Sequence, residues 1–224
     1  MDCRLRSRRS IRCGCLSRGQ RLSAGGRPRR RRLPGLDSPP AARQDGDVTA
    51  LSSPDPVADA ARYQRLLLSL LGSDDPAVVQ AATPAAVDTI IVDAGSALRV
   101  RPAEAEWSVL ELIGHLADAE LVVGGRYRWT IAHDQPPLLG YDQDLWVAGL
   151  RHNADDPREL VGLFRALREA NLALWRRATP AQRQRVGMHS ERGPESYELQ
   201  FRLLAGHDRF HLDQMRKTLA AVKP

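Results

Sequence analysis

Apolar residues recur at helical spacing along most of the chain. Four long segments carry this pattern, and no run of alternating apolar and polar residues convincingly predicts a strand. The first segment begins near Asp55-Pro56, a cap followed by proline at the first helical position, and stops at Gly72. A weaker segment, 74–98, contains a second start at Thr83-Pro84. It predicts one broken helix or two short helices that complete the first arm of the fold.

The other three long segments have clearer boundaries. Ser108 and Glu111 form a capping-box pattern at the start of the second helix, and Asp156-Pro157 starts the third. The expected helices cover 108–132, 156–178 and 196–222, and the polar connections between them cover 133–155 and 180–195. Helices with one apolar stripe each, joined in this way, predict an all-α fold, specifically a four-helix bundle.

Charge is distributed unevenly and defines two regions. Residues 1–45 contain thirteen arginines against three aspartates, a net charge of +10, so the remainder carries −4 of the total of +6. This segment has too few apolar side chains to offset the entropy of ordering. We therefore expect a disordered arginine-rich extension over 1–50 and a folded body over 51–224. The functional alternative for the extension is an arm that binds nucleic acid or a membrane surface, because clustered arginines neutralise phosphates.

Cysteine usage and hydropathy bear on the compartment. The cysteines Cys3, Cys13 and Cys15 all lie in the extension, so the body cannot contain a disulfide framework. The longest strongly apolar run, Leu66–Leu71, is too short to cross a bilayer. These features predict a cytoplasmic body that binds neither a membrane nor nucleic acid.

The last helix carries many polar residues on one face. His207 and His211 are four positions apart, so their side chains point about 40° apart and can bind one ion. The positions within about 40° of His207 are Gln200, Leu203, Gln214 and Thr218. Unpaired buried polar groups cost about 1–3 kcal/mol each, so burial alone does not explain this face.

The two preceding long helices supply further polar candidates. His115 lies on the shoulder of the second helix's apolar face, where Ala119 leaves room for a ligand. Asp118 lies about 60° further round, within reach of a supporting or proton-transfer role. Asn171 lies in the middle of the third helix's apolar face and is a candidate partner for a ligand or substrate. The alternative for Asn171 is a bond to a backbone carbonyl that sets helix packing.

The histidines allow two interpretations, a metal site or satisfied core residues. Three inward histidines with further inward polar groups favour a metal site formed by His115, His207 and His211. The remaining histidines fall in the predicted connections among charged or small residues and are expected at the surface; they are His133, His152 and His189.

Several segments together resemble the DinB-like superfamily, in particular its metal-dependent hydrolase and bacillithiol-transferase-like branch. In the family's order they are EWSVLELIGHLADAE, YDQDLW, RALREANLALWRRATP, GMHSERGPES and LLAGHDRFHLDQM, and the similarity covers about 58–222. The resemblance implies a four-helix bundle that binds a divalent metal through one histidine on the second helix and an HxxxH pair on the last. These positions are His115, His207 and His211.

The chemistry of such a site follows from its ligands. Three neutral imidazoles leave an open coordination position and suit zinc, nickel or iron. The ion could activate water for hydrolysis or stabilise a small thiol for transfer to an electrophile, and the resemblance favours transfer. A small-molecule substrate, such as a low-molecular-weight thiol, and a homodimer are expected. The non-enzymatic alternative is a metal-stabilised or small-molecule-binding bundle with a fourth protein ligand, such as His189 or Asp118.

The long connection 133–155 is expected to border the open side of the site, because long loops in compact domains often carry function. Its acidic and aromatic stretch, Tyr141–Trp146, contains Asp142 and Asp144. The alternative is a solvated connection that Trp146 anchors by packing.

Overall fold

A computed structural model describes residues 59–223 of the chain. The predicted extension, 1–50, and the predicted helix start at Asp55-Pro56 lie outside these residues. The described α-helices are α1 (Ala60–Leu71), α2 (Pro76–Ala94), α3 (Val109–Ala132), α4 (Gln143–Leu150), α5 (Pro157–Arg177), α6 (Pro180–Arg183) and α7 (Tyr197–Val222). The 3-10 helices are η1 (Gly95–Arg99) and η2 (His152–Ala154), and the strands are β1 (Pro137–Leu138), β2 (Val186–His189) and β3 (Gly193–Ser196).

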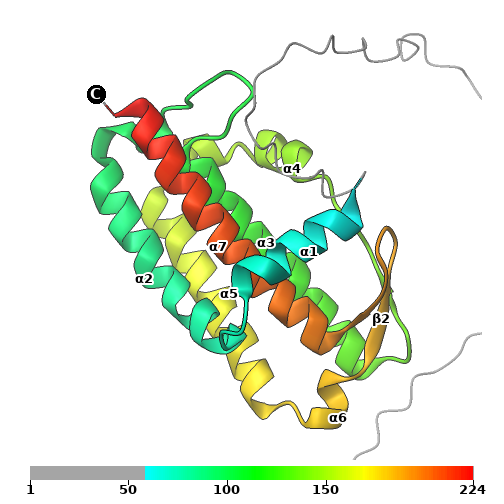
Figure 1. Cartoon of the computed structure of the whole chain (residues 1–224). Coiled ribbons are helices and arrows are strands. Elements are labelled where there is room, and N and C mark those ends of the chain that lie inside the picture. The colour runs from blue at the N-terminus through cyan, green and yellow to red at the C-terminus, as the bar shows by residue number, and fades with distance from the viewer. Residues whose placement is uncertain (1–58, 224) are drawn as a thin grey trace, which may run out of the picture. The chain divides into compact units, whose positions relative to one another are not determined.

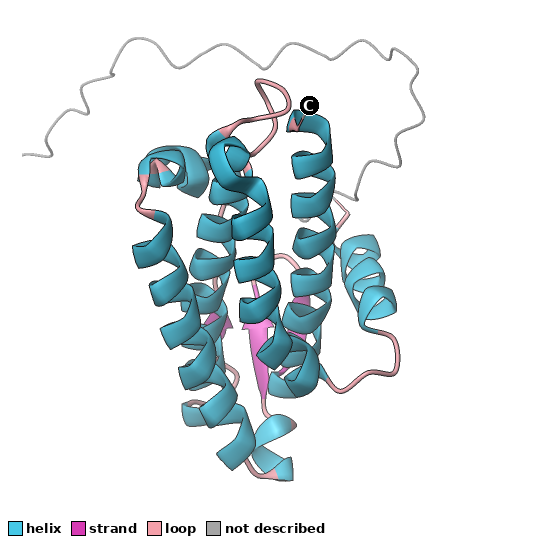
Figure 2. Ribbon diagram, turned by 90° about the vertical axis from the view of Figure 1, so that its left-hand side faces the viewer, coloured by secondary structure: helices cyan, strands magenta, loops and turns pink. Residues whose placement is uncertain are grey.

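The predicted helical bundle is confirmed, and its long helices are α2, α3, α5 and α7. α3 packs against α5 and α7, and α2 packs against the same two helices from the other side. α3 and α5 run in one direction and α2 and α7 in the opposite one (Figure 1). The view in Figure 2 shows the long helices side by side, with the short strands beside them. Because α3 and α5 are parallel, the connection between them must return along the bundle, which explains its length.

α1 lies outside the four long helices and crosses α7 (Figure 1). Gly206 permits the close crossing, since a Cβ atom there would lie 2.0 Å from the Leu67 carbonyl oxygen. Tyr63 and Leu67 bury their side chains against Leu203 of α7. The first predicted segment is therefore an accessory helix, and the segment 74–98 supplies the first helix of the bundle, contrary to the prediction.

α2 continues through Pro84, so the prediction of a broken helix or a second start at this point was wrong. Pro84 has no N–H to donate to the carbonyl of Gln80, one turn earlier. Arg168 on α5 donates to that carbonyl instead, at 3.1 Å, so the exposed acceptor is satisfied by another helix. The stretch Pro76–Arg99 is also long and apolar enough to cross a membrane by length and composition alone, a test that core helices of soluble proteins pass as well.

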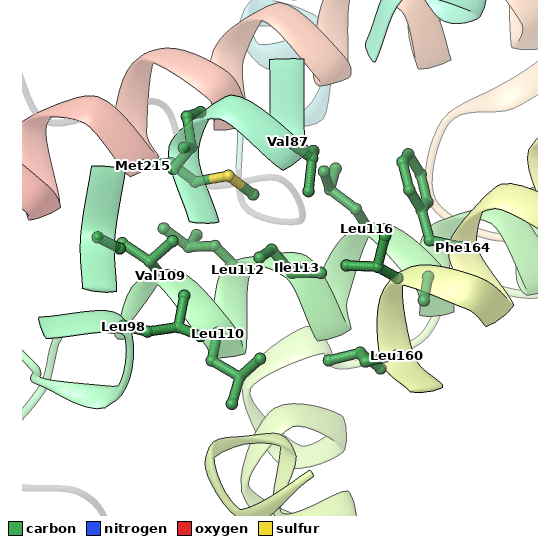
Figure 3. Close-up of a cluster of buried hydrophobic side chains, with 14 of the residues drawn as sticks. Val87, Leu98, Val109, Leu110, Leu112, Ile113, Leu116, Leu160, Phe164 and Met215 are labelled. Atoms are coloured by element: carbon green, nitrogen blue, oxygen red, sulfur yellow. The ribbon is translucent and has the colours of Figure 1, made fainter. Parts of the chain in front are cut away.

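Two apolar clusters fill successive levels of the bundle. The first surrounds the beginning of α3 and is drawn in Figure 3; its labelled residues are Val87, Leu98, Val109, Leu110, Leu112, Ile113, Leu116, Leu160, Phe164 and Met215. The second is largely aromatic, with Trp175 stacked on Phe201 at 4.0 Å between ring centroids, next to Tyr127 and Tyr197. Each large apolar side chain buried in this way contributes about 1.5–3 kcal/mol.

A buried charged network links α2, α3, α5 and α7. Arg168 Nη2 lies 2.8 Å from Asp208 Oδ1 and 2.7 Å from Glu120 Oε1, and each of these three residues is at most 1% exposed. Thr83 donates to Asp208 at 2.7 Å. Burial raises the pKa of Glu120, which the charge of Arg168 opposes. Removing one partner would leave a buried charge unpaired, which is costly. The network therefore fixes how the helices align.

A small three-stranded sheet, which was not predicted, joins the two long connections. β2 and β3 pair antiparallel, with Val186 opposite Ser196, and β1 pairs parallel to β2, with Leu138 opposite His189. Gly187 allows this approach, since a Cβ atom there would lie 2.7 Å from the Leu138 side chain. Strands of two to four residues are too short to show an alternating pattern in the sequence.

Candidate metal centre

Three histidines meet where α3 and α7 pass each other in opposite directions (Figure 1). His115 lies on α3, and His207 and His211 lie on successive turns of α7. His115 Nε2 is 3.0 Å from His207 Nε2, and the ring centroids of His115 and His211 are 4.6 Å apart. One ligand atom from each ring lies within 4.8 Å of the other two. The structure thus brings together the three residues that the sequence predicted as ligands, and we call them the triad.

Burial keeps the triad in its neutral form. Burial lowers the pKa of His211 to about 4, against the opposing effect of its hydrogen bond with Gln214. Burial also lowers the pKa of His115 and His207 well below the usual range, and the neighbouring imidazoles lower them further. Neutral imidazoles have a lone pair to offer, so the three rings are in the state that metal ligation requires.

The ring nitrogens also fit a divalent ion. Gln214 Oε1 accepts from His211 Nδ1 at 2.9 Å, which places the lone pair of His211 on Nε2. That Nε2, and the Nδ1 atoms of His115 and His207, are buried without a hydrogen-bond partner among the described residues. The Nε2 atoms of His115 and His207 are 3.0 Å apart, within hydrogen-bond distance, and this is also close to the spacing of about 3.3 Å expected for two nitrogens bonded to one tetrahedral zinc.

A pocket of about 600 Å³ opens from the triad. α3 lines it with a single stripe of residues spaced by about one turn, namely His115, Ala119, Val123 and Arg126. α1, α7, the connection 133–155 and the β2–β3 hairpin form the other walls. The pocket gives a small molecule access to two of the three histidines.

The connection 133–155 borders this pocket, as its length led us to expect. Tyr141, Asp142 and Asp144 line it together with His115. Asp142 also caps α4 by accepting a hydrogen bond from the Leu145 N–H at 2.9 Å. The ring of Tyr141 packs against Trp146 at 4.7 Å, so the aromatic contact of the alternative interpretation is present as well.

Asp118 contacts His152, and it forms no hydrogen bond with the triad among the described residues. Asp118 Oδ2 lies 2.8 Å from His152 Nε2, and Asp155 Oδ2 lies 2.8 Å from His152 Nδ1. His152 is only 6% exposed, so its predicted surface position was wrong. It reaches α3 because Gly114 leaves space; a Cβ atom there would lie 2.3 Å from the imidazole. This cluster of Asp118, His152 and Asp155 therefore attaches η2 to α3. Asp118 belongs to this contact and not to the triad.

Asn171 lies inside the bundle, as expected, but its partners are not the histidines. Its Nδ2 donates to the Glu120 backbone carbonyl at 3.0 Å and to Glu120 Oε2 at 2.8 Å. Arg128 donates to its Oδ1 at 2.9 Å. Gly124 leaves room for the amide, since a Cβ atom there would lie 2.6 Å from it. This geometry matches the structural alternative, a backbone-carbonyl bond that sets helix packing.

The other two histidines of the connections differ from each other. His133 is exposed, as predicted, whereas His189 is buried in β2 and only 4% exposed, so its predicted surface position was wrong. His189 Nδ1 accepts from the Glu191 N–H at 3.2 Å. Among the described residues, the group that could hold a metal ion consists of the triad, without His189 or Asp118 as a fourth ligand.

The bundle gathers three histidines, His115 and His211 buried and His207 partly exposed, beside a pocket, and this group could hold a metal ion. The model of the DinB superfamily matches residues 77–215, more than half of the chain and including the whole triad. The chain belongs to the DinB superfamily.

Two curated relatives come from Oceanobacillus iheyensis. The chain is 29% identical over 107 residues to "Putative metal-dependent hydrolase OB0782", which is 47% of this chain and 61% of that protein. It is 24% identical over 118 residues to "Putative metal-dependent hydrolase OB0413", which is 52% of this chain and 67% of that protein. The matched segment thus spans about three fifths to two thirds of these relatives.

A solved structure has the same fold. YfiT from Bacillus subtilis, described as a probable metal-dependent hydrolase with an unusual four-helix bundle topology, superposes with a TM-score of 0.60. The match covers 64% of this chain and 83% of YfiT at 21% sequence identity. At this identity the likeness establishes the bundle topology, in which α3 and α5 are parallel.

Proposed function

We propose that this protein is a metal-dependent enzyme that transfers a small thiol to an electrophile at the triad. The observation that carries the proposal is the placement of His115 and His207 in the wall of a 600 Å³ pocket, with all three imidazoles neutral. A divalent ion held there by the triad would stabilise the anionic form of a thiol at neutral pH. The protein's part is to present uncharged ligands, to keep one side of the site open and to orient the bound molecule.

The surroundings of the triad favour a thiol over water as the nucleophile. Among the described residues the side-chain partner of the triad is an amide, Gln214, and no carboxylate is hydrogen-bonded to it. Activation of water benefits from a nearby general base, whereas a thiol that has lost its proton to solvent needs none. In the transfer, the thiolate sulfur bonds to the electrophilic carbon, and the leaving group departs with its electron pair. The body contains no cysteine, so the thiol must be a substrate.

Hydrolysis is the second candidate, because the two Oceanobacillus relatives are named as metal-dependent hydrolases. The non-enzymatic alternative has less support, since it calls for a fourth protein ligand that the described residues do not place at the triad.

The experiment is metal analysis of the purified protein, followed by two parallel assays. One assay joins small thiols to a chromogenic aryl halide, and the other follows cleavage of a chromogenic ester without thiol. We expect about one divalent ion per chain and thiol-dependent turnover that His211→Asn abolishes. Ester cleavage without thiol transfer would favour hydrolysis, and stoichiometric metal without either activity would favour the non-enzymatic alternative.

A further inference from the structure

The pocket has a second polar end, at Arg126. On α3, Arg126 lies eleven residues beyond His115 on the stripe that lines the pocket, which corresponds to about 16 Å along the helix. Ala119 and Val123 separate the two ends with an apolar wall. The triad and Arg126 are therefore the chemically distinct ends of one elongated pocket.

Arg126 is a buried cation without a carboxylate partner. It is only 5% exposed, and no ion pair joins it to any described residue, although it lines an open pocket. Its Nη2 donates to the Leu139 carbonyl, whereas Nε is buried without a partner. Arginine is rarely buried unless it is paired, because removing a guanidinium from water is costly. An unpaired arginine of this kind can donate hydrogen bonds to an acceptor on a bound molecule.

The nearby acidic residues do not neutralise Arg126. Glu195, which is 1% exposed, is bound by Arg192 through Nε at 2.6 Å and Nη2 at 3.2 Å, and it also accepts from Gln64 at 2.7 Å. Glu191 has an exposed side chain and forms no ion pair with Arg126. Glu195 is thus paired with Arg192, and none of the described carboxylates that line the pocket forms an ion pair with Arg126.

His189 of β2 is within reach of the charge of Arg126, but it does not line the pocket. Because its Nδ1 accepts from the Glu191 N–H, its proton lies on Nε2, which is buried without a partner. Burial first, and then the charges of Arg192 and Arg126, lower the pKa of His189 to about 4, so the ring is neutral and has a single N–H group. The unpaired donor at this end of the pocket is therefore the guanidinium of Arg126, whose planar N–H groups are the complement of an anion.

We propose that the Arg126 end of the pocket binds an anionic group, a carboxylate or a phosphate, of the small molecule whose reactive end lies at the triad. The distance between the ends then selects molecules by length as well as by charge. The assignment of the reactive end rests on the proposed function, but the anion subsite itself does not.

The test compares ω-mercaptocarboxylates with ω-mercaptoalcohols of the same chain length. Binding to cobalt-loaded protein is followed through the absorption of the cobalt–thiolate bond. We expect the acids to bind about tenfold or more tightly than the alcohols, but only for chains long enough to span about 16 Å. The preference should disappear in Arg126→Gln and persist in Arg158→Gln, which removes an exposed arginine of α5 that does not line the pocket.

A second arm makes the two proposals separable. Inorganic phosphate and acetate are titrated calorimetrically into metal-free wild-type protein and Arg126→Gln, and the anion that binds identifies the group. Arg126-dependent anion binding without any cobalt–thiolate signal would remove the thiol chemistry and keep the subsite. Equal affinity for acids and alcohols at every length, or binding that Arg126→Gln leaves unchanged, would overturn the subsite. If Arg126→Gln does not fold, Arg126→Lys serves instead, because lysine keeps the positive charge but lacks the paired, planar N–H donors of the guanidinium. We then expect a weaker preference for the acids over the alcohols.

Discussion

At the scale of single residues, His211 differs from the other two triad histidines in having a side-chain partner outside the triad. Gln214 holds its Nδ1, so Nε2 points its lone pair at the other two rings. A metal that binds only the native state adds stability through mass action, and loss of one ligand removes that contribution.

We therefore expect His211→Asn to abolish stoichiometric metal binding and to abolish the rise in Tm that metal gives to the wild type. The measurement is Tm with and without chelator, so that the cost of altering a buried ring cancels. His133→Asn, at an exposed position, is the matched control and should keep the full metal-dependent rise. If the difference in Tm with and without chelator is the same in wild type and His211→Asn, the triad histidines are core residues that bind no metal.

Asn171 is expected to contribute to the free energy of unfolding and not to metal affinity. Asn171→Leu removes both donors to Glu120 and leaves buried acceptors unpaired, which costs about 1–3 kcal/mol. Urea denaturation should show this loss, while the metal Kd stays unchanged. A drop in metal affinity of about 10–100-fold with unchanged stability would instead assign Asn171 to the support of the ligands.

At the scale of elements, two contacts attach η2 and α1 to the bundle. The first is the contact of His152 in η2 with Asp118 in α3. Burial lowers the pKa of His152, but hydrogen bonds with Asp155 and Asp118 outweigh burial and raise it above the ordinary 6.5. The folded protein thus holds the proton more tightly than the unfolded chain. The stabilisation is complete below pH 6.5 and is lost as pH rises through the raised pKa.

His152→Asn should therefore lose stability relative to wild type at acidic pH, and the difference should shrink as pH rises above 6.5. The free energy of unfolding is measured in urea across this window. The difference between the two proteins isolates His152, because the triad and His189, whose pKa values are lowered, act in the opposite sense in both. Parallel pH profiles would contradict the prediction.

The second contact is the crossing of α1 over α7. Gly206→Ala places a methyl group against the Leu67 carbonyl, which is backbone and cannot rotate away, so α1 must shift. We expect a loss of about 1–3 kcal/mol of unfolding free energy. Gly162→Ala is the control: it has open space around it on α5 and should gain about 0.5–1 kcal/mol. Equal effects at the two glycines would show that the crossing tolerates displacement.

At the scale of the whole molecule, charge separates the arginine-rich extension from the body. The net charge is +10 in residues 1–45 and −4 in the remainder, which favours the extension as the part that attracts polyanions. We expect the full chain to be retained on DNA at low salt and released as salt rises, and a chain lacking residues 1–45 to flow through. The metal content should be the same in both. Retention of the shortened chain would assign DNA binding to the body.

Local signals in the sequence determined the helices α3, α5 and α7 and the positions of the triad along them. The capping box of Ser108 and Glu111 and the Asp156-Pro157 start act within one turn, and the structure keeps both. The histidines could be found because a regular helix converts spacing into direction, so His207 and His211 must share a face. Arg168 could have been found in the same way, since it lies between Phe164 and Leu172 on the buried face of α5.

Only the tertiary structure decided the features whose partners are distant in sequence. Pro84 stays inside a helix because Arg168 of α5 satisfies the carbonyl that it leaves open. His152 and His189 are buried because Gly114 leaves space for one and a strand pairing encloses the other. Arg126 forms no ion pair among the described residues, whereas its neighbour Arg192 pairs with Glu195. In each case the physical reason is the same. The free-energy cost of burying a polar group depends on which partner pairs with it, and the local spacing of residues does not show which partner another element supplies.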